Sequence, residues 1–315
     1  MMTTTSTTPS TASEVYSDPN RRHDFVFLID VADGNPNGDP DAGNLPRVDP
    51  ETMQGLITDV AIKRKVRDWV DAMRGEQERF KIYVQNKGIA LNDLHRRGYT
   101  ALEITPTGSK QKREDVEGVR RWMCDNFYDI RTFGAVMTTQ VNAGQVRGPV
   151  QLTFARSIDP IVPIEVAITR VAITDPKDAE VVLTDGQSGA SGKTTEMGRK
   201  SIVPYGLYQG YGFVNPHFAV QTGFSAEDLD LFWGALTNMW DLDRSASRGR
   251  LALRGLYIFT HSNKLGNAPA HTLFERVGVR RSPGATVPRQ FTDYQVTVDG
   301  EGLAEKGVRL TRLVG

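Results

Sequence analysis

The chain has 315 residues, of which 39% are hydrophobic and 24% charged, the proportions of an ordinary soluble globular protein. Lysine plus arginine number 38, as do aspartate plus glutamate. This zero net charge argues against a free-standing, nonspecific nucleic-acid coat, which is usually basic overall, but it permits a basic surface confined to one groove. No apolar run approaches the ~20 residues of a membrane span, and the lone Cys124 cannot form an internal disulfide. We therefore expect a cytoplasmic protein without membrane contact.

Residues 1–21 are rich in serine and threonine and contain no apolar core segment. We expect a disordered tail here and not a signal peptide.

The stretch from Asp24 to Met73 predicts a strand, a turn-rich loop and a basic helix. Residues 24–31 are nearly all apolar and bounded by charge, which favours a buried strand, and turn formers fill residues 33–44. Thr58 is the expected N-cap of a helix over 58–73, whose apolar stripe is flanked by Lys63 and Arg67, with Arg64 on the outer face. A rigid loop followed by a helix that presents cations predicts a site for a polyanion.

Further elements follow in chain order. We expect a helix over 115–128, strands over 164–173, 202–214 and 251–260, and a peripheral strand over 291–298. A helix over 225–240 begins with Ser225 as N-cap and Asp228 in a capping-box variant. Without insertions, the order is βαββαβ, which predicts an α+β fold with a ferredoxin-like, RRM-like sheet. The residues between 73 and 164 then form one large insertion.

Two segments imitate known ligand loops. Asp33, Asn35, Asn37 and Gly38 match the first half of an EF-hand, but its twelfth position is Asn44 instead of a bidentate glutamate, and a strand precedes the loop. Residues 192–194 resemble the end of a Walker A loop, but the spacing to the preceding glycine is wrong and no helix follows. We expect neither calcium nor nucleotide binding.

A third candidate is the acidic group Asp30, Asp33, Asp39 and Asp41. Clustered carboxylates could hold Mg²⁺ for phosphodiester cleavage, whereas turn chemistry favours aspartates that cap their own backbone. The histidines lack the spacing of zinc ligands, and Cys124 fits a small core residue better than a nucleophile. We therefore expect no metal and no cofactor.

Basic residues also occur at several loop–strand junctions, at Arg131, Arg147, Arg156, Arg199 and Lys200. Together with Lys63, Arg64 and Arg67 and an RRM-like sheet, they predict binding of a single-stranded RNA backbone. The alternative is that the cations on the helix only form a solvent-exposed face and bind no RNA.

Long runs of the chain are also recognisable. Asp30-Val-Ala-Asp-Gly-Asn-Pro-Asn-Gly-Asp39 and Gly55-Leu-Ile-Thr-Asp-Val-Ala-Ile-Lys-Arg-Lys-Val-Arg67 closely resemble the repeating backbone subunit of type I-C CRISPR Cascade, a member of the RAMP superfamily. Residues 129–136, 148–157 and 197–208 support the resemblance, which spans about residues 22–300.

The resemblance implies a right-hand shape with an RRM-like palm over 22–315, a finger insertion at about 75–160 and a thumb hairpin at about 184–203. Copies would polymerise head-to-tail along CRISPR RNA together with other Cascade subunits, and leave the bases free to pair with target DNA. The thumb would displace one nucleotide at regular intervals. Candidate RNA contacts are the palm residues Asn35, Asn37, Lys63, Arg64 and Arg67, and the thumb residues Lys193, Met197, Arg199 and Lys200.

The resemblance further implies that the subunit is not an enzyme, because cleavage belongs to a recruited helicase-nuclease. Related type III backbone subunits cleave target RNA with a loop aspartate, which makes Asp33 a candidate. A metal-dependent endoribonuclease using the Asp30–Asp41 loop is therefore the alternative function.

Overall fold

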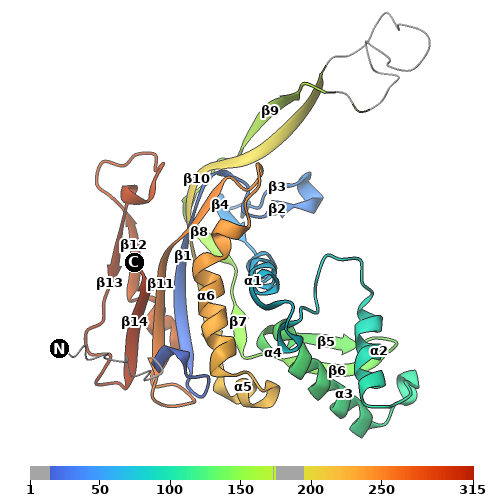
Figure 1. Ribbon diagram of the computed structural model, residues 1–315. Coiled ribbons are helices and arrows are strands. Elements are labelled where there is room, and N and C mark those ends of the chain that lie inside the picture. The colour runs from blue at the N-terminus through green and yellow to red at the C-terminus, as the bar shows by residue number, and fades with distance from the viewer. Residues whose placement is uncertain (1–14, 173, 175–194) are drawn as a thin grey trace, which may run out of the picture.

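The computed structural model describes residues 15–172, 174 and 195–315 (Figure 1). An antiparallel eight-stranded sheet lies at its centre, with the strand order β14-β11-β1-β10-β8-β4, and β7 and β9 also pair with β10. Its strands are β1 (His23–Gly34), β4 (Gln54–Ile57), β7 (Val150–Leu152), β8 (Ala155–Pro160), β9 (Ile164–Arg170), β10 (Glu196–Val214), β11 (Arg250–His261) and β14 (Val308–Val314).

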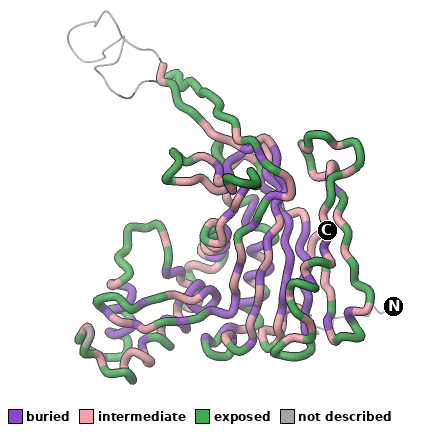
Figure 2. The backbone as a smooth tube through the Cα atoms, turned by 180° about the vertical axis from the view of Figure 1, so that it is seen from behind, coloured by how far each residue is buried: buried purple, intermediate pink, exposed green. Residues whose placement is uncertain are grey.

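The central strand β1 is buried on both of its faces, as its apolar sequence predicts (Figure 2). Phe25 and Phe27 pack under the helices α1 (Asp59–Arg74), α5 (Pro216–Thr222) and α6 (Ala226–Leu242). Val26 and Leu28 face the other way, toward α7 (Ala270–Phe274) and the separate pair β12 (Val277–Arg281) and β13 (Tyr294–Val298). Burying one such side chain stabilises the fold by about 1.5–3 kcal/mol. β1 thus holds three layers together: the helices α1, α5 and α6, the sheet itself, and α7 with the β12–β13 pair.

Both sheet-covering helices begin where their capping residues predict. The Thr58 side chain accepts a hydrogen bond from the backbone of Ala61 at the start of α1. At the start of α6, Ser225 and Asp228 form a complete capping box. These caps satisfy backbone N–H groups that would otherwise lack partners in the first helical turn.

The predicted strand over 164–173 joins the sheet only through the projecting end of β10 and does not pack on its core. β9 is exposed along its whole length and pairs with residues 196–202 of β10, so that the two form a hairpin projecting away from the sheet (Figure 1). The place beside β10 within the sheet belongs to β7 and β8. The chain order β1, α1, β8, β10, α6, β11 is still βαββαβ, but its second strand lies earlier in the sequence than predicted. Side chains alternate between two faces in an exposed hairpin just as they do in a half-buried strand. The alternation of Ile164, Val166 and Ile168 therefore could not show which of the two β9 is.

The insertion has a hydrophobic core of its own, which runs from Tyr83 to Val146. It contains α2 (Leu91–Ala101), α3 (Arg113–Asn126), α4 (Tyr128–Phe133), β5 (Gly134–Thr138) and β6 (Asn142–Arg147). Residues 150–160, which the sequence places in the insertion, pair with the central sheet instead.

Residues 15–21, which the sequence predicts as part of a disordered tail, contact the folded part of the chain. The indole of Trp233 donates a hydrogen bond to the carbonyl of Tyr16 (3.1 Å), and the buried imidazole of His23 bonds the carbonyl of Asp18 (2.8 Å). Residues 1–14 lie outside the described residues, as do residues 184–194 of the expected thumb. Among the helices that the structure describes, none combines the length and hydropathy needed to cross a membrane.

Candidate nucleic-acid interface

The loop after β1 is fastened to the first helix by its asparagines. Asn35 is buried and its side-chain amide donates to the carbonyl of Asn44 (2.7 Å). The Asn37 side-chain oxygen accepts from both the backbone N–H and the hydroxyl of Thr58 (2.9 and 2.8 Å). Two short strands, β2 (Gly38–Asp39) and β3 (Leu45–Pro46), close the loop. The predicted RNA contacts Asn35 and Asn37 are thus engaged in holding this loop against the N-terminus of α1.

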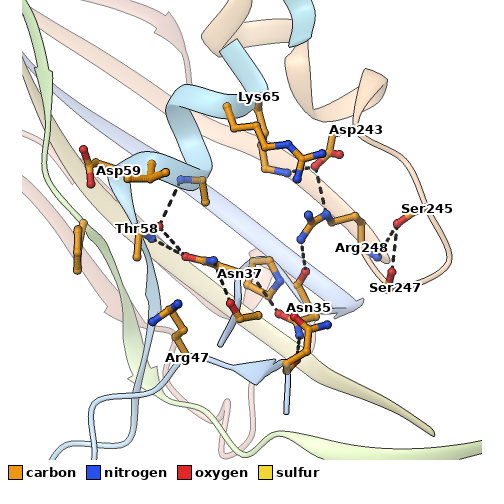
Figure 3. Close-up of a pocket in the computed structure, with 17 residues that line it drawn as sticks. Asn35, Asn37, Arg47, Thr58, Asp59, Lys65, Asp243, Ser245, Ser247 and Arg248 are labelled. Carbon is orange, nitrogen blue, oxygen red and sulfur yellow. Dashed lines mark hydrogen bonds and ion pairs between the residues drawn. The ribbon is translucent and has the colours of Figure 1, made fainter. Parts of the chain in front are cut away.

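The loop, the start of α1 and the turn over 243–248 enclose a cleft of about 750 Å³ (Figure 3). Four basic residues line it: Arg47 from the loop, Arg64 and Lys65 from α1, and Arg248 from the turn. Two carboxylates, Asp59 and Asp243, line it as well. The cleft therefore gathers cations from the neighbouring loop and helix and from a turn that lies about 180 positions later in the sequence.

Asp243 organises one wall of this cleft. Its carboxylate forms ion pairs with the Lys65 amine and, at 3.4 Å, with Arg248. Burial, followed by the nearby guanidinium groups of Arg248 and Arg64, lowers the pKa of Lys65 to about 7, and the carboxylate of Asp68 opposes this effect. Since the Lys65 side chain is only 5% exposed, it supports the wall and offers little charge to the cleft. Arg248 also donates to the carbonyl of Asn35 (3.3 Å).

Of the three cations predicted on α1, only Arg64 lines the cleft; its side chain is 60% exposed. Lys63 pairs with Asp59 (2.9 Å) and Arg67 with the buried Asp129 (2.7 Å). Both cations also lie over the ring of Phe133. The prediction that Lys63 and Arg67 present free charge is corrected, because carboxylates and an aromatic ring already occupy them.

Arg131, predicted to contact RNA, is a core residue. Its guanidinium is fully buried and makes two hydrogen bonds to Asp228 (2.9 and 2.6 Å). Burial alone would raise the pKa of Asp228, but Arg131 and the hydrogen bonds of Ser225 hold it below its usual value. Arg79 reaches the same carboxylate (3.1 Å). The burial of Arg131 excludes a direct contact with RNA.

The other predicted cations lie at the surface. Arg147 is exposed and lies over the ring of Phe218, with 5.6 Å from its guanidinium carbon to the ring centroid. Arg156 pairs with Asp49 (2.8 Å), which lowers the pKa of Asp49. Neither residue lines the cleft, whose walls come from other segments.

On the hairpin, Met197 and Arg199 are more than three-quarters exposed, at 83% and 80%. Their cross-strand partners, Thr169 and Ala167, share their face because side chains of paired residues point to the same side of a ribbon. Lys200, on the other face, donates to the carbonyl of Ala246 (3.3 Å), and Lys193 lies outside the described residues.

The acidic group does not converge. Asp30 is a buried residue of β1, where its carboxylate accepts from the Tyr205 hydroxyl (3.2 Å) and pairs with Arg254 (2.9 Å). Asp39 caps the backbone N–H of Asp41 (3.2 Å), as turn chemistry predicts. In the parts of the chain that the structure describes, no three His, Cys, Asp or Glu side chains form a group that could hold a metal ion.

Sequence reasoning missed Arg47, Lys65 and Arg248 as cleft residues. Arg47 follows the turn-rich loop directly, which is a usable signal. Lys65 falls on the buried side of α1, and Arg248 is separated from the loop by the whole insertion and hairpin, so local patterns could not place them together.

Residues 21–299 match the family model described as CRISPR-associated protein Cas7. A similar curated protein is CRISPR-associated protein Cas7 of Haloferax volcanii, 26% identical over 255 residues, which are 73% of this chain and 67% of that protein. The chain belongs to the Cas7 family of CRISPR-associated proteins.

Three solved structures are also similar to this chain. A CRISPR RNA-guided surveillance complex described as pre-nicking contains a chain with 14% identity and a TM-score of 0.46, covering 76% of this chain and 78% of that one. A second CRISPR RNA-guided surveillance complex gives 15% identity and a TM-score of 0.43, over 76% and 68% of the two chains. A type III-B Cmr-beta complex bound to cognate target RNA contains a chain with 12% identity and a TM-score of 0.39, covering 76% of this chain and 61% of that one.

Proposed function

We propose that this Cas7-family chain is a non-catalytic backbone subunit of a type I-C Cascade complex. It binds the phosphates of CRISPR RNA in the cleft between the 35–47 loop, the N-terminus of α1 and the 243–248 turn. Copies follow one another head-to-tail along the guide, with other Cascade subunits at the ends, and the exposed bases pair with target DNA. A recruited helicase-nuclease then performs the cleavage.

The arrangement of Arg47, Arg64 and Arg248 around one cleft is the observation that carries this proposal. Guanidinium groups match phosphate oxygens in charge and in planar, forked geometry. The first residues of α1 line the same cleft, and the N-terminal end of the helix dipole adds a partial positive charge there. Because Asp59 is neutralised by Lys63, it opposes a phosphate less than a free carboxylate would.

The rest of the fold supports the same assignment. The βαββαβ chain order with α1 and α6 on one face of the sheet suits an RRM-like palm, the insertion with its own core suits fingers, and the projecting β9–β10 hairpin suits a thumb. Met197 on that hairpin is an exposed apolar side chain that can wedge beside a base.

The alternative function is a metal-dependent endoribonuclease that uses Asp33. This residue is exposed at the end of β1, and its backbone has a positive φ of 51°, a conformation that is uncommon outside glycine and often functional. Incubating the purified complex with complementary RNA and Mg²⁺ separates the two functions. Cleavage that disappears in Asp33→Ala would overturn the non-catalytic assignment.

The salt dependence of RNA binding tests the cleft directly. Replacing Arg47 and Arg64 by alanine is expected to weaken binding equally for all guide sequences, since phosphates carry no sequence information. The log–log salt slope should fall by about 0.7 for each single-strand phosphate that the variant no longer neutralises. Arg113→Ala is the matched control, because Arg113 is 91% exposed on the outer helix α3. An unchanged slope in the Arg47 and Arg64 variants would show that these cations are only solvated.

A further inference from the structure

Phe154 is the one aromatic side chain among the described residues that line the cleft, and it is 49% exposed. It lies in the chain directly between β7 and β8. Its neighbour Ala155 pairs with Ile57 at the end of β4, one residue before the N-cap Thr58. The ring therefore lies beside the N-terminus of α1, where the proposed phosphate site is.

A β-bulge turns this ring outward. Leu152 pairs with Gly212, and Arg156 pairs with Gln209. The chain therefore advances four residues from β7 to β8 while the facing strand β10 advances three, so one residue is extra. Val150 and Leu152 point into the core, and strict alternation would direct Phe154 there as well. The extra residue instead gives the core position to Ala155, which is fully buried, and re-aims Phe154 toward the cleft.

Placing Ala155 in the core and Phe154 at the surface is, by itself, unfavourable for folding. A phenylalanine in the core would bury more apolar surface than an alanine, and an exposed ring forgoes that stabilisation. Departures from local packing rules concentrate at functional sites. Bulges in particular are frequent beside such sites, where they redirect a side chain.

We propose that Phe154 is a stacking platform for an unpaired base of the RNA chain whose phosphates lie against Arg47, Arg64 and Arg248. The inference rests on the proposed function and adds a base contact to it. A single exposed ring among cations is the combination that binds single-stranded nucleic acid without reading its sequence, because every base offers a π-face.

The surroundings of the ring favour a nucleotide over an apolar protein segment. Val60 is the other large exposed hydrophobic side chain of the cleft, and most remaining lining residues are polar or charged. An apolar segment would leave these polar groups without partners. A nucleotide places its base on the ring and its phosphate among the arginines.

Binding of the full-length chain to two fluorescein-labelled single-stranded RNAs of equal length, one normal and one with abasic positions throughout, tests this stacking. Phe154→Ala should weaken binding of the normal RNA about 5- to 150-fold per stacked base and leave the abasic RNA unaffected. The log–log salt slope should stay the same, since the variant neutralises the same phosphates. Phe154→Tyr should retain affinity, whereas Phe154→Leu, which keeps apolar bulk without a ring, should resemble the alanine variant.

Melting temperatures of all variants verify folding, which substitution of a half-exposed side chain is expected to leave intact. Equal weakening of normal and abasic RNA by Phe154→Ala, or wild-type affinity in Phe154→Leu, would overturn the stacking role. If the Arg47 and Arg64 variants bind RNA poorly while Phe154→Ala binds it normally, only this inference fails. If the wild-type chain binds neither RNA, the proposed function fails with it.

Discussion

Buried carboxylates determine which cations of this protein are available to a ligand. Asp129 occupies Arg67 and Asp228 occupies Arg131, and Asp243 holds Lys65 within the cleft wall. Arg64 keeps a side chain that is 60% exposed, and its partner Asp68, at 3.5 Å, is itself exposed. The sequence indicates where positive charge is dense along the chain. It does not indicate which charges are neutralised, because Arg131 and its partner Asp228 lie 97 positions apart.

Removing the buried guanidinium of Arg131 is expected to be costly. Arg131→Met leaves Asp228 with one fewer cation in a buried site, which should lower the free energy of unfolding by about 3–5 kcal/mol. Urea unfolding at neutral pH measures this decrease. The double variant Arg131→Met with Asp228→Asn should be more stable than Arg131→Met alone, because the unpaired buried charge is then removed. Arg113→Met, at an exposed pair, should change stability by less than about 1 kcal/mol.

His23 should make folding sensitive to mild acid. Burial is the main cause that lowers its pKa from 6.5 to about 4, so the folded protein resists a proton that the unfolded chain accepts. Stability contributed by neutral His23 is therefore complete above pH 6.5 and declines as pH falls toward 4. Between pH 7.5 and pH 5 the free energy of unfolding should fall by about 2 kcal/mol from this group.

Denaturant titrations of the wild type and His23→Gln at the two pH values isolate that contribution. The glutamine variant lacks the titrating group and should show a smaller decline. Identical pH profiles for the two proteins would contradict the assignment to His23.

Strands and helices with a clear apolar pattern, and helices with a recognisable N-cap residue, were predictable from the sequence. β1, α1 and α6 occur where the apolar pattern and the capping residues place them. The family resemblance implies a thumb hairpin at about 184–203, but the residue pattern does not place β9 in it. Ile164, Val166 and Ile168 alternate like a strand that buries one face, while each remains about two-fifths exposed, at 42%, 40% and 41%. The bulge at Phe154 was equally hidden, since it depends on the register against β10. Nothing within residues 150–157 reveals that register.

The two faces of the β9–β10 hairpin should differ in function. Met197→Ala with Arg199→Ala changes the face that carries the highly exposed Met197, and is expected to weaken binding of complementary DNA by the assembled complex while guide RNA stays bound. Val166→Ala, on the opposite face, is the matched control. Electrophoretic mobility of the complex with labelled target DNA measures the effect. Equal weakening by both variants would show that the faces are not specialised.

The whole molecule combines zero net charge with a cleft that concentrates arginines. Such a protein attracts RNA through one region only, so a single copy neutralises few phosphates and binds weakly, in a salt-sensitive way. A row of copies adds contacts between proteins to these phosphate interactions. An identical, repeated contact between copies must be heterologous, and it produces an open helical row unless other subunits cap it.

Co-expression with a CRISPR RNA of spacer length should therefore yield particles with several copies per RNA. Mass photometry of the purified particles, with RNAs of increasing length, should show the copy number rising with length. A single copy on every RNA would contradict the assembly. The isolated chain without RNA is the control and is expected to remain small.

Asp228 serves two structures at once, since it closes the capping box of α6 and receives Arg131 from the insertion. This double role limits how the protein can be redesigned. A shortened version that keeps the sheet and discards residues 81–147 would leave the buried Asp228 with Arg79 as its one remaining cationic partner among the described residues, even though the discarded part has a core of its own. An engineer who wants a minimal palm must first replace Asp228 with a neutral residue that still caps the helix, such as asparagine.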